Sequence, residues 1–168
     1  MKYDPLNVFT FGYLPARNVF RNIKQFFKNI KYGWQRATKG YCDWDLWDLD
    51  QYHLVLLERA LTAFKKNNNG YPSELTAEAW DKILDRMIYC YHMAYEYLYN
   101  TEEYNEFYEP WSASIDHSGM KKNEFIISDN EELRNKMIER DNELIKQGIE
   151  YATEASNLMI KYERNLWY

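Results

Sequence analysis

Two short acidic runs have the residue types and spacing that could bind Mg²⁺ and cleave a nucleotide. They are Asp45-Leu-Trp-Asp48 and Glu78-Ala-Trp-Asp81. A spacing of three residues places both carboxylates of a run on one face of a helix. Carboxylates on two facing helices can hold Mg²⁺, which polarises phosphate oxygens and activates water. The candidate metal ligands are therefore Asp45, Asp48, Glu78 and Asp81.

A Mg²⁺-dependent hydrolase is nevertheless the alternative function rather than the preferred one. All-α nucleoside triphosphate pyrophosphatases use an E-x-x-E helix that faces an E-x-x-D helix. The run 78–81 fits the second element, but the run 45–48 lacks the glutamates of the first. The acids of the run 78–81 need no metal if they lie on a solvent-exposed helix face. Lys82 and Arg86 are then their partners one turn away. The chain also has no glycine-rich phosphate loop, so we expect a binding protein without a cofactor.

The corner that follows the first predicted helix gathers a cation, aromatic rings and acids. Arg36 precedes Tyr41 and Trp44, and the next helix is expected to begin at about residue 43. A helix N-terminus beside a cation and rings can bind an anion, although the local aspartates oppose this. Asp50 falls among core positions and needs a partner, and Arg36 is within reach. The candidate ligand- or partner-binding residues are Arg36, Tyr41, Asp43, Trp44, Trp47, Asp50, Tyr71 and Trp80.

Aromatic residues make up 18% of the chain, including 16 Tyr and 6 Trp. This exceeds what the core of one small domain can hide, so we expect some of the rings to lie on the surface. Exposed aromatic residues beside arginine are typical of binding hot spots. The expected partner is a protein or a small anionic ligand, and a homo-oligomer is left open.

The charges of the chain are split along its length. Residues 1–42 carry eight basic and one acidic side chain, a net charge of +7, whereas the remaining residues carry −12. The basic stripe of the first predicted helix, with Phe20, Phe26, Phe27 and Trp34, could contact a membrane surface or nucleic-acid phosphates. It could equally pair with acidic neighbours. A virion or DNA-packaging component is thus a second alternative, but the net charge of −5 disfavours nucleic acid, and no apolar run is long enough to span a membrane.

Scarce glycine and proline and a helical apolar period predict an all-α fold. We expect one four-helix bundle-like domain over residues 1–168, with an extended arm at 1–15 and one long crossover loop before the last helix. Each helix should turn its apolar stripe inward, and in the first helix this stripe is Phe20, Ile23, Phe27, Ile30 and Trp34. The helices are expected at about 16–38, 43–66, 76–100 and 130–166.

Several segments resemble a widespread set of small helical proteins encoded by tailed bacteriophages. The shared motifs are Arg36-x-x-Lys-Gly-Tyr-x-Asp43, Trp47-x-Leu-Asp50, Gly70-Tyr-Pro72 and Leu75-Thr-x-x-x-Trp80-Asp-x-Ile-Leu84. The resemblance covers residues 30–98 and, more loosely, 140–168. It implies a phage accessory protein that acts in the host cytoplasm against host defence, by sequestering a host protein or a small anionic nucleotide-type signal. The resemblance assigns no catalytic or binding residue to this chain.

Overall fold

The computed structural model describes residues 4–12, 19–67, 70–115 and 130–166. Within these ranges the chain forms helices and turns without any strand, which confirms the all-α prediction. The chain divides into two units, Met1–Asn67 and Asn68–Tyr168, here called unit 1 and unit 2. The prediction that both belong to a single domain stays a prediction. No helix among the described residues is long and apolar enough to cross a membrane.

Unit 1 contains a short 3₁₀ helix and two long α-helices. The 3₁₀ helix η1 spans Val8–Thr10, within the predicted arm, and packs on α1. The two helices are α1, Val19–Lys39, and α2, Leu49–Asn67. Helix α1 is followed by Gly40, whose φ of 82° is the left-handed conformation that glycine adopts without strain. Helix α2 begins six residues later than predicted, because residues 43–48 form a loop that closes around Arg36.

The core of unit 1 is small and aromatic. Phe11 is fully buried and lies with Val8 and Cys42, and Tyr32 and Trp44 pack around this cluster. The Phe11 and Trp44 rings are stacked, with centroids 5.5 Å apart. The N-terminal segment, α1 and the loop after α1 therefore meet at one ring.

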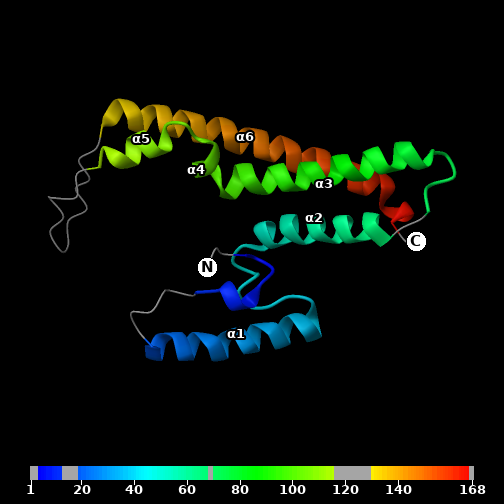
Figure 1. The fold of residues 1–168 in the computed structure, drawn as a ribbon, viewed down its shortest axis with the longest axis horizontal. Helices are drawn as coiled ribbons and strands as arrows, with labels where there is room; N and C mark the ends of the chain where they lie inside the picture. Colours follow the sequence, from blue (N-terminus) through cyan, green and yellow to red (C-terminus); the bar gives the residue numbers. More distant parts are fainter. Residues whose placement is uncertain (1–3, 13–18, 68–69, 116–129, 167–168) are drawn as a thin grey trace. The chain divides into compact units, whose positions relative to one another are not determined.

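Unit 2 is built around two long helices that run side by side, α3, Ala77–Tyr99, and α6, Glu131–Tyr162 (Figure 1). Both begin at capping side chains, since the Thr76 hydroxyl accepts from the Ala79 N–H and the Asn130 side chain accepts from the N–H groups of Glu132 and Leu133. The crossover between them contains α4, Thr101–Tyr104, and α5, Tyr108–Ala113, and its part at 116–129 lies outside the described residues. The short 3₁₀ helix η2, Glu163–Asn165, follows α6.

Helices α3 and α6 pack closely because α6 carries a small residue at the contact. A Cβ placed on Gly148 would lie 2.8 Å from Leu98 Cγ. Arg86 of α3 bridges to Glu154 of α6 through two hydrogen bonds of 2.7 and 2.6 Å. The buried side chains of α3 are Trp80, Leu84, Met87, Cys90, Tyr91 and Ala94, and the buried residues of α6 are Met137, Leu144, Gly148 and Ala155.

Candidate functional site

Arg36 is the centre of a polar network inside unit 1. Its guanidinium binds both carboxylate oxygens of Asp45, with the Nε–Oδ2 distance at 2.9 Å. It also donates to the backbone carbonyls of Leu6 and Pro5. The guanidinium carbon lies 4.8 Å from the centre of the Tyr52 ring, a cation–π distance. Arg36 thus joins α1, the N-terminal segment, the loop and α2.

The Asp45 carboxylate is buried and fully engaged. Its side chain is 1% exposed, and Oδ2 also accepts from the Cys42 backbone N–H at 2.7 Å. Burial by itself would raise the pKa of Asp45, but the hydrogen bonds from Arg36 and from Cys42 hold this pKa below its usual value. Asp45 therefore serves as a structural anion.

Arg36, which the sequence places within reach of Asp50, binds Asp45 in the structure. That placement assumed a helix from residue 43, but the loop at 43–48 turns back and brings Asp45 to the end of α1. Asp43 also serves this loop, because it accepts from Lys31 Nζ and Gln35 Nε2, both at 2.8 Å. Arg36 and Asp43 therefore make their contacts inside unit 1, and the Arg36 guanidinium is not an open site for an anion.

The candidate metal ligands are divided between the two units. Asp45 is held by Arg36, and Asp48 is exposed in the same loop, whereas Glu78 and Asp81 are exposed on the first turns of α3. In the part of the chain that the structure describes, no group of three or more His, Cys, Asp or Glu side chains is placed to hold a metal ion.

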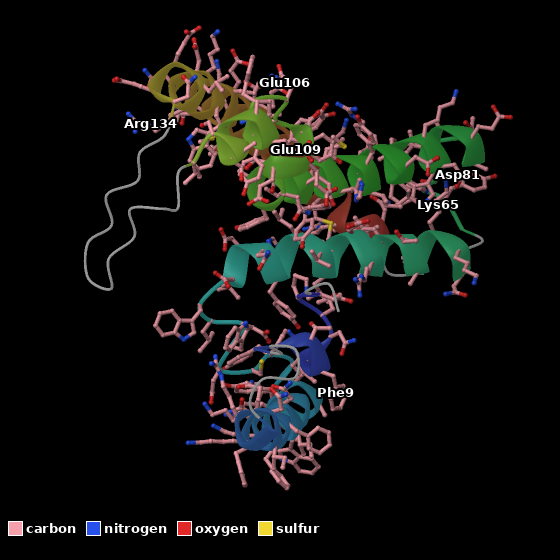
Figure 2. All side chains as sticks on the ribbon, turned by 60° about the vertical axis from the view of Figure 1, so that its left-hand side comes forward. Phe9, Lys65, Asp81, Glu106, Glu109 and Arg134 are labelled. Carbon is pink, nitrogen blue, oxygen red and sulfur yellow. The ribbon has the colours of Figure 1, made fainter. Side chains whose placement is uncertain are left out.

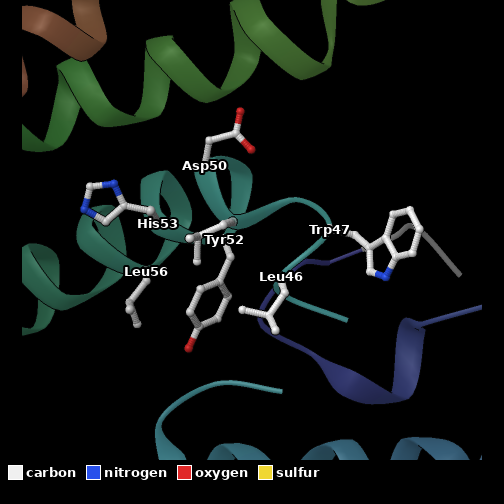
Figure 3. Close-up of a pocket in the computed structure, with 7 residues that line it drawn as sticks. Leu46, Trp47, Asp50, Tyr52, His53 and Leu56 are labelled. Carbon is white, nitrogen blue, oxygen red and sulfur yellow. The ribbon is translucent and has the colours of Figure 1, made fainter. Parts of the chain in front are cut away.

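An apolar hollow of about 640 Å³ lies at the start of α2. Trp47, a predicted partner-binding residue, projects from the loop and is 87% exposed. Asp50 adds a carboxylate to the wall, and Figure 3 shows both residues together with the neighbours that the sequence analysis did not single out. The lining residues are Leu46, Trp47, Leu49, Asp50, Tyr52, His53 and Leu56.

The remaining predicted residues have different surroundings. Tyr41 is exposed, whereas Trp44 packs in the core of unit 1. Tyr71 and Trp80 belong to unit 2. Tyr71 is exposed there, but Trp80 is 2% exposed and contacts Tyr162 with ring centroids 5.5 Å apart. Of the eight predicted residues, Trp47 and Asp50 are the two that line the hollow.

Comparison of the chain with family models, with curated proteins and with solved structures finds no match. The geometry of the described residues is therefore the basis for a functional proposal.

A second apolar surface is the outer face of α1, whose rings the sequence offers either as core or as a membrane or nucleic-acid contact. The stripe that we expected to point inward is exposed, with Phe20 85% and Trp34 72% accessible. The face that α1 turns toward its own unit is polar instead. Asn29 is fully buried there and donates to the Phe11 carbonyl at 3.2 Å. The signal that could have revealed this is the spacing of Gln25, Asn29 and Arg36, which share a helix face separate from the apolar stripe.

Proposed function

We propose that the protein is a non-enzymatic binding protein that takes up a polypeptide segment in the hollow beside Trp47. The observation that carries this proposal is that the apolar hollow has a solvent-exposed Trp47 ring beside it. Leu46, Trp47 and Leu49 are all more than half exposed. The first two lie on the loop that the Arg36–Asp45 pair holds, and Leu49 begins α2. A preorganised apolar surface loses little entropy when it captures a side chain.

The charge of the hollow favours a basic polypeptide over a small anion. The exposed carboxylate of Asp48 lies beside Trp47 in the same loop. The nearby Arg36 already holds Asp45. The fitting partner is therefore a segment with an apolar side chain next to a lysine or arginine, since opposite charges at the rim steer and align it.

The resemblance to phage-encoded proteins supports a setting for this activity. In that setting the protein is an accessory protein in the host cytoplasm, and its partner is a host protein that the phage benefits from sequestering. The basic segment that enters the hollow belongs to that host protein.

Photo-crosslinking in bacterial lysate tests this proposal. A benzophenone amino acid replaces Leu46 at the hollow, and in a matched control it replaces Ile138, an exposed position on α6. We expect a discrete crosslinked protein with Leu46 only, and its crosslinked peptide should carry lysine or arginine beside an apolar residue. Trp47→Ala should remove the crosslink because it removes the largest contact in the hollow.

Three results would count against the proposal. Crosslinks from Leu46 that reach only this same chain would mean that the hollow is closed by the protein itself. A crosslink that survives Trp47→Ala and also appears from Ile138 would indicate nonspecific capture. A captured segment rich in acids would contradict the charge that we assign to Asp48 at the rim of the hollow.

A further inference from the structure

Helix α1 divides its surface into three faces. With about 100° between successive residues, the stripe of Phe20, Ile23, Phe27, Ile30 and Trp34 covers about 120° together with Phe26. All six of these side chains are exposed. The polar face with Asn29 and Arg36 packs against the rest of unit 1. The apolar stripe is thus a lateral surface that unit 1 leaves uncovered.

The N-terminal segment widens this apolar stripe. Phe9, exposed on η1, lies 6.5 Å from Phe26 between ring centroids, and Phe26 meets Phe27 edge-to-face at 6.0 Å. Figure 2 shows Phe9 close to α1, where rings gather along the helix. The result is one continuous aromatic surface that two separate segments of the chain build.

The third face of α1 is basic. Arg21, Lys24, Lys28 and Lys31 follow one edge of the apolar stripe, and all are exposed. Residues 19–39 contain no aspartate or glutamate. Lys31 reaches Asp43 in the following loop, an exposed ion pair at the end of the row. A surface that combines exposed rings with an unbroken row of cations calls for a partner that is both apolar and anionic.

The size and width of the stripe disfavour a helical protein partner. A coiled-coil seam is narrow and uses Leu, Ile or Val as knobs that fit between four side chains of the facing helix. Here three of the five positions are Phe or Trp, and Phe26 and Phe9 broaden the surface to one side. A second copy of α1 would also bring two rows of lysines together. Nucleic acid would leave the apolar stripe in water.

We propose that α1 lies in the surface of an anionic phospholipid bilayer, with its rings among the acyl chains and its lysines at the lipid headgroups. Interfacial helices have this composition, with a large apolar face flanked by Lys and Arg. The whole chain carries −5, so general attraction to an anionic membrane does not explain binding, and the local row of cations must supply it. This surface is separate from the hollow at Trp47 and does not depend on its function.

Vesicle co-sedimentation of the full chain tests the proposal. The probes are vesicles of phosphatidylcholine alone and vesicles of phosphatidylcholine mixed with phosphatidylglycerol. We expect about tenfold tighter binding to the anionic vesicles, with loss of binding at high salt. Phe27→Glu should weaken this binding at least about tenfold, since it puts a charge into the apolar layer.

Matched variants separate the α1 face from general effects. Ile160→Glu makes the same change on α6, at a side chain 71% exposed compared with 66% for Phe27, and it should leave binding unchanged. Lys28→Glu should weaken binding about tenfold, whereas Lys146→Glu, with an identical change in net charge, should not. Trp47→Ala should also bind vesicles normally, which keeps this test independent of the hollow.

Four outcomes would overturn the proposal. No binding to either kind of vesicle would remove the lipid partner, and equal binding to both would remove the proposed role of the lysines and the anionic headgroups. Sedimentation velocity that shows a dimer lost only in Phe27→Glu would reassign the face to a second copy. Salt-sensitive retention on DNA that Lys28→Glu abolishes, without vesicle binding, would reassign it to nucleic acid.

Discussion

The guanidinium of Arg36 binds both carboxylate oxygens of Asp45, nine residues further along the chain, in a pair whose side chains are 14% and 1% exposed. Because the same guanidinium holds the carbonyls of Pro5 and Leu6, one side chain fixes three segments of unit 1. The pair holds the loop that carries Trp47 against the last turn of α1.

Replacing Asp45 by Asn should strongly destabilise unit 1. The change leaves a buried guanidinium without its counter-charge, which costs about 3 kcal/mol of unfolding free energy. Urea unfolding followed by circular dichroism measures this loss. Asp43→Asn provides the control, since the exposed Asp43–Lys31 pair should contribute little. Equal effects of the two variants would contradict the central role of Arg36.

The same pair predicts how stability depends on pH. The pKa of Asp45 in the folded protein lies below its ordinary value, because the hydrogen bonds from Arg36 and Cys42 outweigh its burial. The stability from this group is therefore complete above the unfolded pKa of about 4 and is lost as the pH falls toward the folded pKa. The difference in unfolding free energy between the wild type and Asp45→Asn should shrink below about pH 4. A difference that stays constant down to pH 2 would contradict this.

Two glycines in helix interiors should respond oppositely to alanine. Alanine favours a helix by about 1 kcal/mol over glycine, so Gly33→Ala should stabilise the protein, since its Cβ would meet Val8 at an ordinary 3.6 Å. At Gly148 the new Cβ would lie 2.8 Å from Leu98 Cγ and 3.2 Å from Tyr97 Cβ. Overpacking costs about 1–3 kcal/mol, so Gly148→Ala should be net destabilising. Thermal unfolding of both variants checks the two signs.

The sequence predicts unit 2 better than unit 1 for a physical reason. Helices α3 and α6 follow from local signals, since Thr76 and Asn130 cap them and a 3.6-residue period sustains them. In unit 1 the decisive interactions are not local. Four aspartates between residues 43 and 50 could each pair with Arg36, and only the folded loop selects Asp45.

The outer face of α1 shows a second limit of sequence patterns. An amphipathic period says that a helix has an apolar face, but it does not say what covers that face. Here Asn29 and Arg36 find backbone carbonyls in the N-terminal segment, so the polar side turns inward and the rings stay outside. Similarly, the helix expected at about 43–66 begins only at Leu49, so Leu46 lies on the preceding loop and lines the hollow together with Leu49.

The two cysteines should be inert in the folded protein. Cys42 and Cys90 are both buried and reduced. Burial raises the pKa of the Cys90 thiol to about 11 and that of the Cys42 thiol above its ordinary value, so almost no reactive thiolate exists at neutral pH. Ellman's reagent at pH 8 should give no rapid colour until denaturant is added, and then two thiols. A fast reaction in buffer alone would contradict this burial.

Each unit carries one of these two cysteines, Cys42 in the first and Cys90 in the second. The rate at which each cysteine is alkylated under native conditions therefore reports how often its own unit opens. Peptide mass spectrometry measures both rates in a single sample. Two different rates would identify the unit that unfolds locally more often. One common rate would mean that both cysteines become accessible through cooperative unfolding of the whole chain.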